Sequence, residues 1–266
     1  MATRARAWTA RAAGLLSICL VACGADPEPS PPRRSARPAV EPPREPPREP
    51  TTAPARPVDE PPPELAHAPT CALVEPPAGL VDLRVLIPSV IIVAGYHRHD
   101  NFTGAPLPGY EAAGAWLEAD AANALARAAA RLEASGLRLI VYDAYRPRRA
   151  SEAMVEWCRA HDRQDLLDDG WVAAHSAHSR GRAIDLGLAR ADGTALDMGS
   201  RWDQFDQTSF LRGVEGEPLR NRLELRAALV QVGFRPYTRE WWHFGFEADT
   251  PAPVRDRAYS CAQQRR

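Results

Sequence analysis

The sequence His178-Ser179-Arg180-Gly181-Arg182-Ala183-Ile184-Asp185 and, later in the chain, Glu240-Trp241-Trp242-His243 guide the interpretation of this protein. Together they supply two imidazoles and one carboxylate, on His178, Asp185 and His243. Three such side chains suffice for a catalytic zinc, because a fourth position then stays open for water. Glu240 is left as a spare carboxylate beside the last ligand. A His-x6-Asp spacing alone is a weak signature, so structural or exposed histidines are the open alternative.

Residues 183–188 have the alternation of a β-strand with one apolar face. Successive side chains point to opposite faces of a strand. The apolar face holds Ile184, Leu186 and Leu188. Asp185 therefore points away from the core, and we expect it to face a cleft.

A second strand is expected over residues 241–246, where Trp241, His243 and Gly245 fall on one face. Strict alternation then places Glu240 and His243 on opposite faces. For both side chains to reach one site, the chain must form a turn at Glu240, just before the regular strand begins.

The rest of the folded part predicts an α+β domain, with a small, mainly antiparallel sheet flanked by helices. Apolar spacing and glycine stops predict helices over residues 112–134, 149–160 and 220–232. Residues 81–93 are rich in Val, Ile and Leu but contain Pro88, which favours an extended stretch. Residues 137–142 predict a buried strand that delivers polar residues to its end: Asp143, Tyr145 and Arg146.

The first residues have the pattern of an export signal. Residues 1–22 combine a basic start with an apolar run too short to span a bilayer. Leu20-Val21-Ala22-Cys23 resembles the lipobox of bacterial lipoproteins, in which cleavage leaves the cysteine lipid-modified. We therefore expect an exported protein, lipid-anchored to the cell envelope through Cys23, with its folded domain in the periplasm or outside the membrane. An ordinary secretory signal is the alternative.

Residues 23–67 predict a disordered, proline-rich tether. The segment is rich in Pro, Arg, Glu and Ala and has too few apolar side chains to offset the entropy of ordering. Its prolines keep it extended, so it acts as a semi-stiff spacer. The folded domain is then expected over residues 68–266. A leader without a role is the alternative reading of the tether.

Three cysteines follow the tether, and the formal net charge is -1. In an oxidising compartment Cys71 and Cys261 could form a disulfide that links the two ends of the domain. Two free thiols are the alternative. Cys158 is expected in the core of a helix. A balanced charge gives no reason to expect a nucleic-acid partner.

These features resemble the D-alanyl-D-alanine dipeptidases, the zinc family that includes the vancomycin-resistance dipeptidase. The resemblance covers the two motifs above and three further blocks: Asp100-Asn101-Phe102-Thr103-Gly104, Asp143-Ala144-Tyr145-Arg146-Pro147 and Met198-Gly199-Ser200-Arg201-Trp202-Asp203. The zinc motifs are shared with D,D-carboxypeptidases, whereas the Asn-Phe-Thr-Gly and Met-Gly-Ser-Arg blocks favour the dipeptidases.

The resemblance implies hydrolysis of a small dipeptide with one zinc per chain. It implies His178, Asp185 and His243 as zinc ligands. It implies Glu240 as the general base and Arg146 as the donor to the oxyanion.

It also implies four substrate-binding residues: Asp203 for the free amine, Asp143 behind Arg146, and Ser176 and Tyr96 at the pocket wall. Two other functions stay open. One is a D,D-carboxypeptidase that trims peptidoglycan stems. The other is a non-catalytic cell-wall-binding domain with a structural zinc. The presence of Glu240 and Arg146 disfavours this alternative, because a structural zinc needs neither residue.

Overall fold

The structure is a computed structural model that describes residues 71–248 and 250–262. The expected signal segment, Cys23 and the proline-rich tether lie outside these residues. Within the described part of the chain, no helix has the length and apolar character needed to cross a membrane.

A five-stranded sheet with the order β2-β4-β5-β7-β6 forms the centre of the domain. Its strands are β2 (Ile91–Ile92), β4 (Leu137–Asp143), β5 (Ala183–Arg190), β7 (His243–Phe246) and β6 (Phe234–Pro236). Only the β2–β4 pair is parallel among them. A separate antiparallel pair joins β1 (Leu80–Asp82) to β3 (Trp116–Glu118). The predicted α+β class with a small, mainly antiparallel sheet is confirmed.

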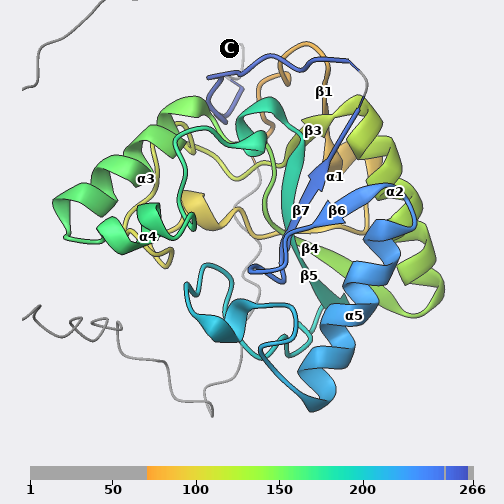
Figure 1. Cartoon of the computed structure of the whole chain (residues 1–266). Helices are drawn as coiled ribbons and strands as arrows, with labels where there is room; N and C mark the ends of the chain where they lie inside the picture. Colours follow the sequence, from red (N-terminus) through yellow and green to blue (C-terminus); the bar gives the residue numbers. More distant parts are fainter. Residues whose placement is uncertain (1–70, 249, 263–266) are drawn as a thin grey trace, which may run out of the picture. The chain divides into compact units, whose positions relative to one another are not determined.

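Two helices, α2 (Ala119–Ala134) and α5 (Gly216–Val230), pack on one face of this sheet (Figure 1). The buried cluster between them and the strands includes Leu125, Leu132, Leu225, Leu229, Leu139, Val141, Ile184, Leu186 and Leu188. Each such side chain contributes about 1.5 to 3 kcal/mol when fully buried. The apolar face predicted for β5 is therefore the face against the helices.

A second core lies among α3 (Arg148–Ala160), α4 (Gln164–Asp168) and several loops (Figure 1). It is largely aromatic, with Tyr96, Tyr110, Trp116, Tyr145 and Tyr259 all buried. Cys158 is a free, buried thiol on α3, as the sequence predicts.

The register of the three central strands aligns three polar residues. Asp143 of β4 pairs with Asp185 of β5, and Asp185 pairs with His243 of β7. The β4–β5 register shifts between Val141 and Asp143. Regular alternation would direct Asp143 to the helix-covered face with Val141, whereas this bulge brings it opposite Asp185.

The structure corrects two expected elements near the start of the domain. The stretch over residues 81–93 is not extended throughout, because α1 (Leu83–Leu86) interrupts it. The Asp82 carboxylate begins this short helix by accepting from the Arg84 backbone N–H. The helix expected over residues 112–134 begins only at Ala119, because Leu117 pairs with Val81 in the β1–β3 ladder.

Two further boundaries differ from the expectation, and one short helix is additional. α5 begins at Gly216, before the expected residue 220, and α4 was not predicted. β7 begins at His243, so the alternation expected from Trp241 does not hold. Trp241 and Trp242 both lie in the main core, because burial of their apolar rings is favoured over strict alternation between the two faces.

A disulfide joins Cys71 to Cys261 near the two ends of the described domain. Close to it, Tyr259 is fully buried, and its hydroxyl donates to the Tyr145 carbonyl at 2.7 Å. The same hydroxyl accepts from the Trp116 backbone N–H at 3.1 Å. The C-terminal segment is thus fixed to the aromatic core by both covalent and polar contacts.

Reduction of this disulfide should lower the free energy of unfolding by about 2 to 5 kcal/mol, because a cross-link across a long loop restricts the unfolded chain. The bond spans 190 residues. Urea unfolding with and without reductant measures the effect. Cys261→Ser should match the reduced wild type, and Cys71→Ser/Cys261→Ser should cost no more. Equal midpoints for oxidised and reduced protein would contradict the role of this bond.

Candidate functional site

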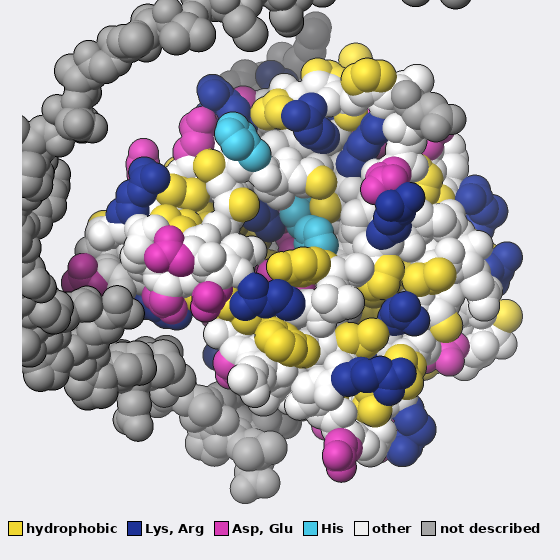
Figure 2. All heavy atoms as spheres, viewed as in Figure 1, with side chains coloured by type: hydrophobic (Ala, Val, Ile, Leu, Met, Phe, Trp, Pro, Cys, Tyr) yellow, Lys and Arg dark blue, Asp and Glu magenta, His cyan; other side chains and the backbone are white. Residues whose placement is uncertain are grey.

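A pocket of about 240 Å³ lies on the sheet face opposite α2 and α5. Its walls come from Tyr96, from Arg146 after β4, and from the segments 170–178, 203–205 and 237–243. Figure 2 shows histidine side chains in the hollow of this face. The volume falls just below the range of about 300 to 1,000 Å³ typical of pockets for drug-sized ligands, which favours a small substrate.

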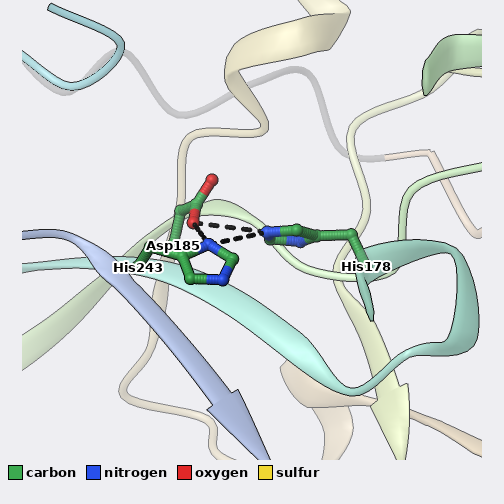
Figure 3. A group of neighbouring side chains, drawn as sticks. All are labelled: His178, Asp185 and His243. Atoms are coloured by element: carbon green, nitrogen blue, oxygen red, sulfur yellow. Dashed lines mark hydrogen bonds and ion pairs between the residues drawn. The ribbon is translucent and has the colours of Figure 1, made fainter. Parts of the chain in front are cut away.

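Three side-chain atoms that can bind a metal ion lie close together in this pocket (Figure 3). His178 Nε2 lies 3.4 Å from Asp185 Oδ1 and 3.2 Å from His243 Nδ1, and the last two atoms are 3.0 Å apart. A tetrahedral zinc with bonds of about 2.0 to 2.2 Å needs ligand atoms roughly 3.3 to 3.6 Å apart. One of the three distances lies in this range and the other two are 0.1 to 0.3 Å shorter than its lower end, so a small outward movement of the ligand atoms gives the spacing of a zinc site. The mixed nitrogen and oxygen chemistry of the three ligand atoms fits zinc.

His178 is oriented by a contact on its far side. It lies in the 3₁₀ helix η2 (Ala177–Arg180), and its Nδ1–H donates to the Ala144 carbonyl at 2.7 Å. Because the carbonyl can only accept, Nδ1 carries a hydrogen, and Nε2 is the nitrogen that faces the pocket. Metal-bound histidines commonly have such a partner on the second nitrogen.

Asp185 is a buried carboxylate held from two sides. Its Oδ2 accepts from the Trp202 indole N–H at 3.3 Å, and its Oδ1 faces His243. Burial works to raise the pKa of Asp185, but His178 and His243 outweigh it and hold this pKa well below the usual range. Asp185 is therefore ionised at neutral pH, as a carboxylate must be to bind a metal.

Glu240 lies next to the three metal-binding side chains but is not one of them. The chain turns before β7, since the His243 backbone N–H donates to the Glu240 carbonyl at 3.3 Å. This is the turn that the alternation of the sequence required, and it places Glu240 Oε2 3.8 Å from His243 Nδ1. Burial raises the pKa of Glu240 to about 7.

Arg146 faces the pocket from the end of β4. Its Nε donates to Asp143 Oδ2 at 2.9 Å, its Nη2 forms an ion pair with the same oxygen at 2.9 Å, and its guanidinium lies 4.9 Å from the centre of the Tyr96 ring. Asp143 is held in turn by the Tyr110 hydroxyl, which donates to its Oδ1 at 2.5 Å. The cation is therefore fixed in direction before any substrate arrives.

Asp203 brings a third carboxylate into the pocket, beside those of Asp185 and Glu240. The Tyr96 hydroxyl donates to its Oδ2 at 2.8 Å. Its backbone has φ of 58°, a left-handed conformation that aspartate tolerates better than most residues. Burial and the charge of Asp185 raise the pKa of Asp203 well above its usual range.

Ser176 lines the pocket and also has a local structural role. Its hydroxyl accepts from the His178 backbone N–H at 3.2 Å and caps η2. All of the residues expected at the site from the sequence therefore lie in or directly behind one pocket.

Sequence reasoning missed two supporting residues, Trp202 and Tyr110. Trp202 donates to Asp185 and stacks on Tyr142 with ring centres 5.6 Å apart. Trp202 lies in one of the motif blocks, but nothing in the local sequence shows that its indole reaches Asp185. Tyr110 follows a turn-forming stretch that carried no functional signal.

The comparison with known proteins decides the family. A family model described as D-ala-D-ala dipeptidase matches residues 77–265. The chain belongs to the D-alanyl-D-alanine dipeptidase family. A D-alanyl-D-alanine dipeptidase of Escherichia coli (strain K12) is 39% identical over 184 residues, which cover 68% of this chain and 92% of that protein. One of Enterococcus faecium is 35% identical over 191 residues, covering 66% and 94%.

Membership of this family, one of zinc metallopeptidases, makes the protein an enzyme. The metal-binding side chains of His178, Asp185 and His243 lie within the matched residues. Glu240, Arg146 and Asp203 lie there too. The expected resemblance is confirmed at the level of the family.

Gly95→Ala should destabilise the site, because an added Cβ would lie 2.1 Å from the Trp202 ring. Forcing the indole aside is expected to lower the free energy of unfolding by about 1 to 3 kcal/mol. Chemical denaturation measures this loss. Gly245→Ala is the matched control, since a Cβ there meets nothing closer than the Arg235 carbonyl at 4.0 Å. Equal stability of the two variants would show that Trp202 is not tightly packed.

Proposed function

We propose that this protein hydrolyses D-alanyl-D-alanine to two molecules of D-alanine, with one zinc ion held by His178, Asp185 and His243. The proposal rests on one observation. The three metal-binding side chains share their pocket with a carboxylate that is not a ligand, Glu240, and with an oriented cation, Arg146. Membership of the family supports the substrate, because the relatives from Escherichia coli and Enterococcus faecium are named D-alanyl-D-alanine dipeptidases.

Glu240 acts as the general base. A bound zinc would polarise the scissile carbonyl and lower the pKa of a water to about 7. Glu240 takes a proton from the attacking water and delivers it to the leaving amine. Its pKa of about 7 suits both roles, because such a group can accept and donate near neutral pH.

Arg146 stabilises the oxyanion that develops on the carbonyl. Burial would lower the pKa of Arg146, but the neighbouring Tyr96 and Asp143 raise it above its usual value, so the guanidinium keeps its charge. A donor fixed in advance costs no reorganisation during the reaction. Asp143 supplies that fixation without contacting the substrate.

Asp203 recognises the free amine of the dipeptide. Among the described residues it forms no ion pair, and burial with the nearby Asp185 raises its pKa. An ammonium group bound beside it would restore the carboxylate form and gain a charge-assisted hydrogen bond. A longer peptide has an amide in place of this amine, so the contact favours dipeptides.

Glu240→Gln should lower kcat for D-alanyl-D-alanine by about 10² to 10⁴ while the zinc content stays unchanged, because only the proton-transfer group is lost. Release of D-alanine by the purified, zinc-loaded protein is the measurement. Glu247→Gln is the control, since Glu247 is exposed and pairs with Arg235 at the surface.

A D-alanine-terminated pentapeptide tests the alternatives in the same assay. Cleavage of the pentapeptide but not of the dipeptide would replace the proposal with a D,D-carboxypeptidase. No cleavage of either substrate would favour a non-catalytic cell-wall-binding domain.

We further propose that the enzyme is exported and lipid-anchored through Cys23. The lipobox-like Leu20-Val21-Ala22-Cys23 supports this, and so does the Cys71–Cys261 disulfide, because such bonds persist in oxidising compartments.

Cys23→Ala should move the protein from the membrane fraction to the soluble fraction of fractionated cells, because the lipid anchor is lost. Labelling with a fatty-acid probe should disappear in the same variant, and Cys158→Ala should keep both properties. A wild-type protein that is already soluble and unlabelled would contradict the anchor.

A further inference from the structure

Arg222 is a fully buried arginine on α5 that forms no ion pair within the described residues. Buried arginines are usually paired with a carboxylate, because an uncompensated charge in the interior is costly. Burial lowers the pKa of Arg222 to about 10, so the group is still a cation at neutral pH. Its direct partners are therefore neutral oxygen acceptors, while the charge of Asp197 acts from beyond ion-pair distance and raises the pKa of Arg222.

The acceptors of Arg222 all come from one loop, residues 198–210. Its Nε donates to the Met198 carbonyl at 2.6 Å, and its Nη2 donates to Ser200 Oγ at 3.1 Å. Its Nη1 donates to the carbonyls of Thr208 and Phe210 at 2.8 and 2.7 Å. One rigid guanidinium thus ties together both ends of a loop whose regular structure is limited to the 3₁₀ helix η3 (Gln207–Ser209).

The part of the loop between these anchors enters the pocket. It carries Trp202, which donates to Asp185, and Asp203, which accepts from Tyr96. Neither residue contacts Arg222 by a hydrogen bond, so any influence of Arg222 on them passes through the loop backbone.

Arg222 also connects the loop to the turn that carries Glu240. Its guanidinium lies 5.4 Å from the centre of the Trp241 ring. The Trp241 indole N–H donates to Ser200 Oγ at 2.9 Å, and the Trp241 backbone N–H donates to the Ser209 carbonyl at 2.9 Å. The loop and the Glu240 turn therefore share one polar anchor inside the protein.

We propose that Arg222 is a positioning residue for the reaction: it holds the loop 198–210 so that Asp203 meets the substrate amine. The inference rests on the proposed function, which assigns the amine to Asp203. A fixed loop is needed because a displacement of about 1 Å at a recognition group can cost on the order of 10²-fold in rate. Lysine cannot replace the guanidinium, since it lacks the planar fork that reaches acceptors on two sides.

The test compares the zinc-loaded wild type with Arg222→Lys in binding two phosphinate dipeptide analogues, one with a free amine and one without it. Calorimetry gives the ratio of the two dissociation constants, which is the amine preference. We expect Arg222→Lys to reduce this preference by at least about tenfold and to raise KM for the dipeptide more than it lowers kcat. Asp203→Asn should reduce the preference in the same way.

Arg84→Lys is the matched control, because Arg84 also donates to a backbone carbonyl, that of Ala113 at 2.8 Å, but contributes nothing to the pocket. It should lower the melting temperature and leave the amine preference unchanged. An Arg222→Lys protein that loses thermal stability but keeps the wild-type preference would overturn the proposal.

Ser200→Ala decides the question if Arg222→Lys fails to fold. It removes the hydroxyl that accepts from both Arg222 and the Trp241 indole, which is the shared anchor of the loop, and should reduce the amine preference in the same direction. An unchanged preference would overturn the proposal. Wild-type hydrolysis of the dipeptide is measured in parallel. Its absence would count against the proposed function, whereas hydrolysis with an unchanged preference in the variants would count against the role of Arg222 alone.

Discussion

The hydrogen-bonded register of β4, β5 and β7 is the constraint on which the whole site depends. Residues paired across neighbouring strands have Cβ atoms about 4.5 to 5.5 Å apart. A row of Asp143, Asp185 and His243 is therefore compact before any side-chain interaction is considered. His178 joins this row from a short 3₁₀ helix, and its bond to the Ala144 carbonyl ties that helix to the chain just after β4.

The charges of the pocket are balanced unevenly, and the imbalance matches its proposed chemistry. The negative charge of Asp143 is balanced by its ion pair with Arg146, and the ionised form of Asp185 is stabilised by two histidines. Glu240 and Asp203 have raised pKa values, because each is buried near other carboxylates without a full cation of its own. The pocket is thus prepared for added positive charge, which a metal ion and a substrate ammonium would supply.

The polar residues keep their positions because aromatic and buried groups support them from behind. Trp202 lies between Tyr142 and the close backbone of Gly95 and directs its N–H to Asp185. Tyr110 fixes Asp143, and its ring lies 5.5 Å from that of Tyr259, in the segment that the disulfide holds. Close packing of this kind restricts the rotamers that the polar side chains can adopt.

The sequence by itself determined the α+β class, the apolar face of β5, and the residue types of the site, because periodicity and motif chemistry are local properties. It also required the turn at Glu240, since alternation alone separates that residue from His243. Only the tertiary structure decided where α2 begins, that a bulge turns Asp143 toward Asp185, and that Arg222 holds the pocket loop. These features depend on partners distant in the chain, such as Val81 for Leu117 and Met198 for Arg222, and local preference carries no information about such partners.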